Sequence, residues 1–102
     1  MKQVLLSSDD EVKVYLVPDE VADNLEHYCW EFSVNWIWHN PNGAKLLKKV
    51  DGIKVAFYGV TDFIDYLNEW VFPQQPSTLV AQLDCYEDEL PEEYRGYPQY
   101  NF

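Results

Sequence analysis

The chain has 102 residues, of which 17% are aromatic, and its 18 acidic residues outnumber seven basic ones to give a formal net charge of −11. This length predicts one domain with a single core, and the aromatic content excludes a disordered chain, because disordered sequences lack the apolar mass that offsets chain entropy. The acidity argues against direct binding of nucleic acid, whose affinity for proteins comes mostly from lysine and arginine.

The first residues predict a β-hairpin. Residues 3–6 and 12–17 are apolar runs, the second with partial alternation, and the polar sequence SSDDE between them suits a turn. Pro18 ends the second strand. Asp19 and Glu20 then place negative charge where the first turn of a helix favours it.

Residues 19–38 predict a long central helix. A polar stripe and an apolar face both recur at steps of three or four residues, which is helical periodicity. The stripe contains Glu20, Asp23, Asn24, His27, Glu31 and Asn35, and the apolar face contains Val21, Leu25, Tyr28, Phe32 and Trp36, with Cys29 beside them. Alternation from Trp30 to Trp38 would also suit a strand. The helical pattern is preferred because it persists over about five turns.

The middle of the chain predicts two helices, a turn and a strand. Asn40 and Pro41 suit a helix start, giving a short helix to about residue 48. Asp51-Gly52 is a tight-turn signal, and residues 53–58 follow as a third strand. Thr61 is expected to cap an amphipathic helix over 61–71, which Pro73 stops. Residues 77–83 suit either a short capped helix or a strand, and we favour the helix.

Together these elements predict an α+β domain over residues 1–83. A small three-stranded antiparallel sheet would pack against the central helix and the second amphipathic helix. Residues 84–102 form an acidic tail that contains four tyrosines and a phenylalanine. We expect this tail to pack on the domain, because its aromatic surface favours burial and its charge complements the lysines within residues 45–54.

Two stretches carry a resemblance to known proteins. The string DFIDYLNEWVFP (residues 62–73), followed by Ser77, Leu79 and Val80, and the ending YPQYNF resemble a family of small uncharacterised bacterial proteins from gut Firmicutes and their relatives. PDEVADNLEHYC, Trp38 and Asn40-Pro41 are similar to the first half of that family. The chain departs from the pattern after Leu83, where Asp84-Cys85 replaces a glycine-tryptophan pair. The resemblance implies a stand-alone bacterial domain and assigns no catalytic residue.

No catalytic, cofactor-binding or metal-binding residue is assigned from the sequence. Asp23, His27 and Glu31 are spaced four residues apart and could contribute to a metal site, but Asn24 stands where a Glu-x-x-His motif needs its glutamate. An ion-paired or solvated helix face is the simpler interpretation. No serine lies in a G-x-S-x-G elbow, and Cys29 is separated from His27 and His39 by helix geometry.

The aromatic residues point to protein–protein contact. Trp30, Val34 and Trp38 predict a partly exposed strip that meets a protein partner or a second copy, because tryptophan is enriched at interface hot spots. The acidic stripe of Glu20, Asp23, His27 and Glu31 would contribute specificity.

Three functions follow from these residues. The first is a non-catalytic interaction module. The second is an acidic nucleic-acid mimic, such as an immunity or anti-defence inhibitor of a basic nuclease or DNA-binding protein. The third is a small enzyme or metal-binding protein. Neither of the first two functions requires a cofactor, a membrane or direct contact with nucleic acid.

The start of the chain and its cysteines predict a cytoplasmic location. Residues 1–11 lack the pattern of a signal or transit peptide, and no window approaches the roughly 18 apolar residues of a membrane helix. Cys29 and Cys85 are the only cysteines. A disulfide is not expected between them in the absence of a secretory context.

Overall fold

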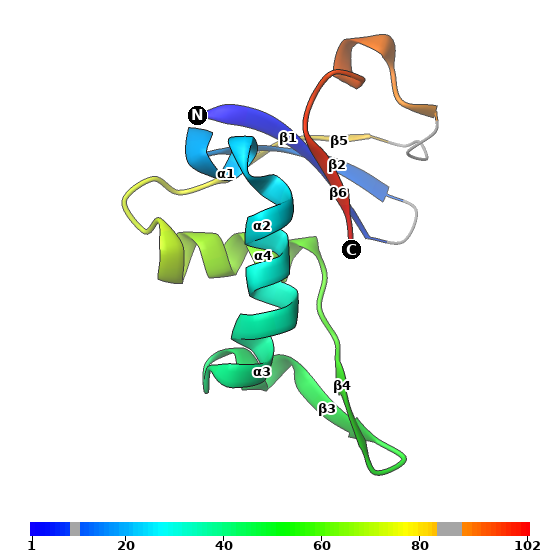
Figure 1. The fold of residues 1–102 in the computed structure, drawn as a ribbon. Helices are drawn as coiled ribbons and strands as arrows, with labels where there is room; N and C mark the ends of the chain where they lie inside the picture. Colours follow the sequence, from blue (N-terminus) through cyan, green and yellow to red (C-terminus); the bar gives the residue numbers. More distant parts are fainter. Residues whose placement is uncertain (9–10, 84–88) are drawn as a thin grey trace.

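The computed structural model describes residues 1–8, 11–83 and 89–102. Its main sheet has four strands in the order β5–β2–β1–β6 (Figure 1). Strands β1 (Lys2–Ser8), β2 (Glu11–Val17) and β5 (Thr78–Leu83) pair antiparallel, whereas β6 (Gln99–Asn101) runs parallel to β1. The α+β class is confirmed, but the expected three-stranded antiparallel sheet is wrong. The turn expected between the first two strands falls partly on residues 9–10, outside the described residues.

The expected third strand belongs to a second, separate sheet. Strand β4 (Ile53–Ala56) pairs antiparallel with β3 (Leu47–Val50), and neither joins the main sheet. Asp51 and Gly52 have φ angles of 52° and 80°, the positive values that a two-residue hairpin turn requires. The short helix expected up to residue 48 is therefore wrong. Only one 3₁₀ turn, η2 (Gly43–Leu46), forms, because the reversal at 51–52 gives residues 47–50 a strand partner.

The helix favoured for residues 77–83 is also wrong, since this segment is strand β5. Its backbone groups pair with the edge of β2 that β1 leaves free. Leu79 lies opposite Tyr15 and Ala81 lies opposite Val14, so Val80 is an extra residue between these two pairs. The entry into the strand is fixed by Asn68. Its side chain accepts a hydrogen bond from the Ser77 N–H at 2.7 Å and donates one to the Ser77 carbonyl at 3.2 Å.

Replacing Asn68 by alanine should destabilise the domain by about 1–3 kcal/mol, because the buried Ser77 backbone loses both hydrogen-bond partners. Asn68→Asp should cost less, since the carboxylate still accepts from the Ser77 N–H. Chemical denaturation gives the free energies, and hydrogen exchange should show the amides of β5 opening first in the alanine variant. Equal costs for the two substitutions would contradict the donor–acceptor assignment.

The central helix is present but interrupted. It consists of α1 (Asp19–Asp23), α2 (Leu25–Trp30), the π-helical segment η1 (Glu31–Trp36) and α3 (Ile37–His39). Asn24 leaves helical geometry at φ −134° and ψ 39°, and its side-chain amide donates to the Glu20 carbonyl at 3.0 Å. In the wider π turn, residues five apart fall on one side, and Phe32 and Ile37 are accordingly both fully buried.

The second amphipathic helix spans α4 (Val60–Tyr66) and the π-helical segment η3 (Leu67–Val71). Gly59 occupies its N-cap in place of the expected Thr61, and the Asp62 carboxylate accepts the Gly59 N–H at 2.9 Å. Both helices pack on the same face of the main sheet. Their main cluster buries strand residues Val4, Leu6, Tyr15 and Val17.

A smaller cluster covers the opposite face of the sheet. Leu5, Val12 and Val14 are buried there against Leu90, next to the 3₁₀ turn η5 (Glu92–Tyr94). Farther along, the Phe102 ring reaches the main cluster, and its N–H donates to the Ser7 carbonyl at 2.9 Å. The start of the expected tail, residues 84–88, lies outside the described residues.

Candidate interaction surface

The helix from Leu25 to His39 presents an apolar strip to solvent. Trp30, Val34 and Trp38 are 56%, 51% and 42% exposed. Phe32 and Ile37 are buried, so Val34 between them faces away from the core, and Trp30 and Trp38 lie four residues before and after Val34. The Trp38 indole N–H already donates to the Ser33 carbonyl at 3.1 Å, so the ring offers mainly apolar surface to a partner. These three residues are named the Trp strip.

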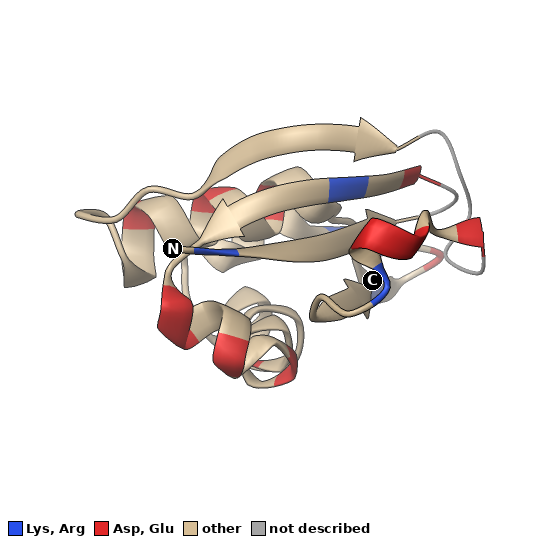
Figure 2. Cartoon of the chain, turned by 90° about the horizontal axis from the view of Figure 1, so that it is seen from above, with Lys and Arg blue, Asp and Glu red and all other residues tan. Residues whose placement is uncertain are grey.

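The acidic stripe lies beside the Trp strip. Glu20, Asp23 and His27 are exposed and Glu31 is half-buried. Figure 2 shows acidic positions along this helix, on the second helix and on η5. The Asp23 carboxylate forms an ion pair with Lys2 at 2.7 Å, and this hydrogen bond raises the pKa of the Lys2 ammonium.

The possible metal ligands do not come together as a site. Within residues 1–8, 11–83 and 89–102, no three histidine, cysteine, aspartate or glutamate side chains are grouped so that they could hold an ion. Asp23 is already paired with Lys2, and Glu31 accepts a hydrogen bond from the Asn35 amide at 2.9 Å. The break at Asn24 also separates Asp23 from His27 along the helix.

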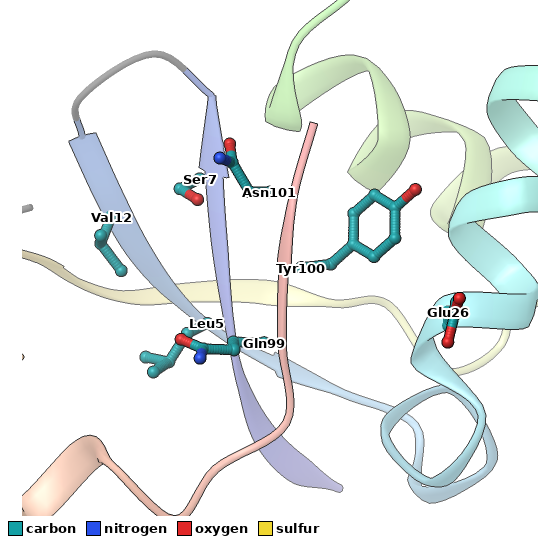
Figure 3. Close-up of a pocket in the computed structure, with 7 residues that line it drawn as sticks. All are labelled: Leu5, Ser7, Val12, Glu26, Gln99, Tyr100 and Asn101. Atoms are coloured by element: carbon teal, nitrogen blue, oxygen red, sulfur yellow. The ribbon is translucent and has the colours of Figure 1, made fainter. Parts of the chain in front are cut away.

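Cys29 is the one cysteine in the described part of the chain. Cys29 is fully buried, and burial raises the pKa of its thiol far above the ordinary value, which suppresses the reactive thiolate. A cavity of about 360 Å³ lies around the edge strand β6. Figure 3 shows Glu26 and Tyr100 on the side of β6 toward α2, whereas Ser7 and Asn101 lie on the side toward β1. These polar groups therefore do not converge on one point.

A second exposed apolar surface, which is not predicted from the sequence, lies on the β3–β4 hairpin. Val50, Ile53, Val55 and Phe57 are all exposed, and Ile53 reaches 67%. We name these four residues the hairpin face. The sequence predicts residues 53–58 only as a third strand, but the same residues suit a hairpin with one unpartnered face. The signal that could have identified it was the Asp51-Gly52 turn, which is typical of a two-residue hairpin between neighbouring strands.

Positive charge is concentrated at the hairpin. Segment 45–54 holds four lysines and one aspartate, so the rest of the chain carries three basic and seventeen acidic residues, a formal charge of −14. The Lys48 ammonium lies 5.4 Å from the centre of the Phe57 ring, within the range of a cation–π contact. The molecule thus has a basic arm and an acidic body.

The acidic body contains one carboxylate that opposes folding. The pKa of Asp65 is raised, first by desolvation and then by the charges of Glu69 and Asp62. Because the pKa of Asp65 is higher in the folded state, protonated Asp65 stabilises the fold at pH values below its ordinary pKa of 3.8. This stabilisation is lost as the pH rises through the folded-state pKa.

Asp65→Asn should therefore stabilise the domain at pH 7, by about 0.2–0.5 kcal/mol for each like-charge helical pair removed. The gain should vanish in acid, where Asp65 is protonated. Thermal unfolding between pH 3 and pH 7 measures this difference. Glu93→Gln, which removes the same charge from an exposed position on η5, serves as the control. A gain equal to that of the control would contradict the assignment.

Comparison with known proteins yields no family model that matches the chain, and no curated protein or solved structure with significant similarity to it. None of the helices in the described ranges has both the length and the apolar character needed to span a bilayer. The two exposed apolar surfaces and the charge around them are therefore the features from which a function can be inferred.

Proposed function

We propose that this chain is a non-catalytic protein–protein interaction module that binds its partner through the Trp strip. The observation that carries the proposal is the exposure of Trp30, Val34 and Trp38 along one side of a single helix. Isolated exposed apolar residues are ordinary, but contiguous ones that include tryptophan are typical of interfaces. A helix supported by the core on its other side presents them rigidly, which lowers the entropic cost of binding.

The acidic residues next to the Trp strip would give the interaction its specificity. Glu31 follows Trp30 directly in the chain, and Glu26 precedes it by one helical turn. Carboxylates at the rim of an apolar patch favour a basic partner and accelerate association. The resemblance to small bacterial proteins adds a bacterial setting to the proposal.

The test is capture of proteins from a nuclease-treated bacterial lysate by the tagged chain. A partner should be retained at high salt, and the double variant Trp30→Ala/Trp38→Ala should lose it. Trp70→Ala is the matched control, because Trp70 is 50% exposed but lies on the other helix. Retention of the partner by the double variant would contradict the role of the Trp strip.

A second candidate function is an acidic nucleic-acid mimic that inhibits a basic nuclease or DNA-binding protein. The formal charge of −14 outside segment 45–54 favours it. A mimic binds mainly through charge, so its partner should be lost steeply as salt rises. Glu20→Gln/Glu31→Gln should then weaken capture more than Trp30→Ala/Trp38→Ala. The reverse ranking would support the interaction module.

The third candidate, a small enzyme or metal-binding protein, has the least support, since Cys29 is buried and Asp23 and Glu31 have other partners. Metal analysis of the purified protein tests it directly. Stoichiometric metal that is lost on His27→Ala would favour this function over the other two.

A further inference from the structure

The β3–β4 hairpin projects from the rest of the molecule (Figure 1). Directly opposed residues in an antiparallel pair share one face. Val50 opposite Ile53 and Lys48 opposite Val55 therefore share a face, and Lys49 opposite Lys54 belongs to the other. The base of the hairpin contacts the body, where Leu47 and Ala56 pack against the main cluster.

The exposed face that contains Val50 and Ile53 is mostly apolar, with Lys48 among its apolar residues. It runs from Val50 and Ile53 through Val55 to Phe57, whose N–H extends the pairing by donating to the Leu46 carbonyl at 2.8 Å. A two-stranded hairpin is marginally stable in water unless a further surface covers it. The hairpin face is therefore a surface that gains stability when a partner covers it.

Charge identifies the kind of surface that fits. Lys48 lies on the same face as Val50 and Ile53, directly opposite Val55, so a carboxylate next to an apolar patch would complement it. The complementary surface is therefore an apolar patch flanked by acidic groups. The Trp strip has this composition, with Glu26 and Glu31 beside Trp30.

We propose that a second copy of this chain covers the hairpin face, with the hairpin of each protomer docked on the Trp strip of the other. This inference rests on the proposed function for the use of the Trp strip and adds the identity of one partner. Reciprocal docking closes a two-fold dimer, so neither surface remains free to extend the assembly. It also uses two patches on each protomer, which enlarges the contact toward the roughly 800 Å² per partner of a standard interface.

Sedimentation equilibrium measured across a concentration series, at about 50 mM and about 500 mM salt, tests the dimer. The wild-type protein should form dimers, with weaker association at the higher salt. Ile53→Asp places a charge in the hairpin face, and Val34→Lys places a charge in the Trp strip. Each variant should be monomeric. Both positions are exposed, so the thermal unfolding of each variant should stay close to that of the wild type.

Mixing the two variants distinguishes reciprocal docking from other dimers. Ile53→Asp retains an intact Trp strip and Val34→Lys retains an intact hairpin, so the mixture should form a heterodimer with one contact. A wild-type monomer at every concentration would overturn the proposal. Dimerisation of Val34→Lys alone would also overturn it, because it would show that the hairpins dock on each other. Binding of a wild-type monomer to anionic vesicles through its lysines would overturn it as well.

The same variants separate this inference from the proposed function. Ile53→Asp should lose the dimer but still capture a heterologous partner through its intact Trp strip. Capture by Ile53→Asp without any wild-type dimer would overturn the dimer and leave the proposed function standing. A dimer without any heterologous capture would support the self-association alone.

Discussion

Replacing Phe32 by alanine should lower the free energy of unfolding by about 3–5 kcal/mol, the usual cost of removing a buried phenylalanine ring. Phe32 is fully buried at the centre of the aromatic cluster. Its ring centroid lies 5.2–6.4 Å from those of Trp36, Tyr58, Phe63, Tyr66 and Phe102. These rings come from both helices, the segment after β4 and the end of the chain. Removal of the Phe32 ring would therefore take a contact from each of these rings and loosen the whole main cluster.

Val34→Ala is the matched control for Phe32→Ala, because it lies two residues away on the same π-helical segment but is exposed. It should change stability by less than about 0.5 kcal/mol. Trp36→Ala should cost less than Phe32→Ala, since Trp36 is only half-buried. Urea denaturation of the three variants tests this order. Equal effects of Phe32→Ala and Val34→Ala would show that the helix faces are assigned incorrectly.

Gly43→Ala should destabilise the domain by about 1–3 kcal/mol through overpacking. Gly43 is buried where η2 crosses the end of the central helix. An added Cβ atom would lie 2.5 Å from the Trp36 carbonyl oxygen and 2.7 Å from the Ile37 Cα atom, closer than such atoms approach without backbone movement. Because both contacts are with backbone, a side-chain rotation cannot relieve them.

Gly96→Ala provides the control for Gly43→Ala. No atom lies within 4 Å of a Cβ added at Gly96, and its φ angle does not require glycine. This substitution should be neutral or slightly stabilising, because it reduces the entropy of the unfolded chain. Thermal unfolding of the two variants separates close packing from the general effect of adding a methyl group. A neutral Gly43→Ala would mean that η2 does not approach the helix as closely as described.

The charge pattern and the helical periodicity are properties that the sequence by itself determined. The apolar spacing from Val21 to Phe32 places these residues on one side of the helix, because a helix face is set by local geometry, and this side is buried in the main cluster. The sequence also determined the turn at Asp51-Gly52, because these two residues adopt the positive φ angles that reverse the chain. The exposure of Trp30 and Trp38 then follows from the burial of their neighbours.

Only the tertiary structure decided which strands pair and what covers each face. Residues 77–83 suit either helix or strand by local preference, and they become a strand because Asn68 fixes Ser77 beside the open edge of β2. Likewise, residues 53–56 alternate like a core strand, yet the separate hairpin they form leaves Ile53 in solvent. Strand pairing depends on backbone partners that are distant in the chain, and no local pattern specifies them.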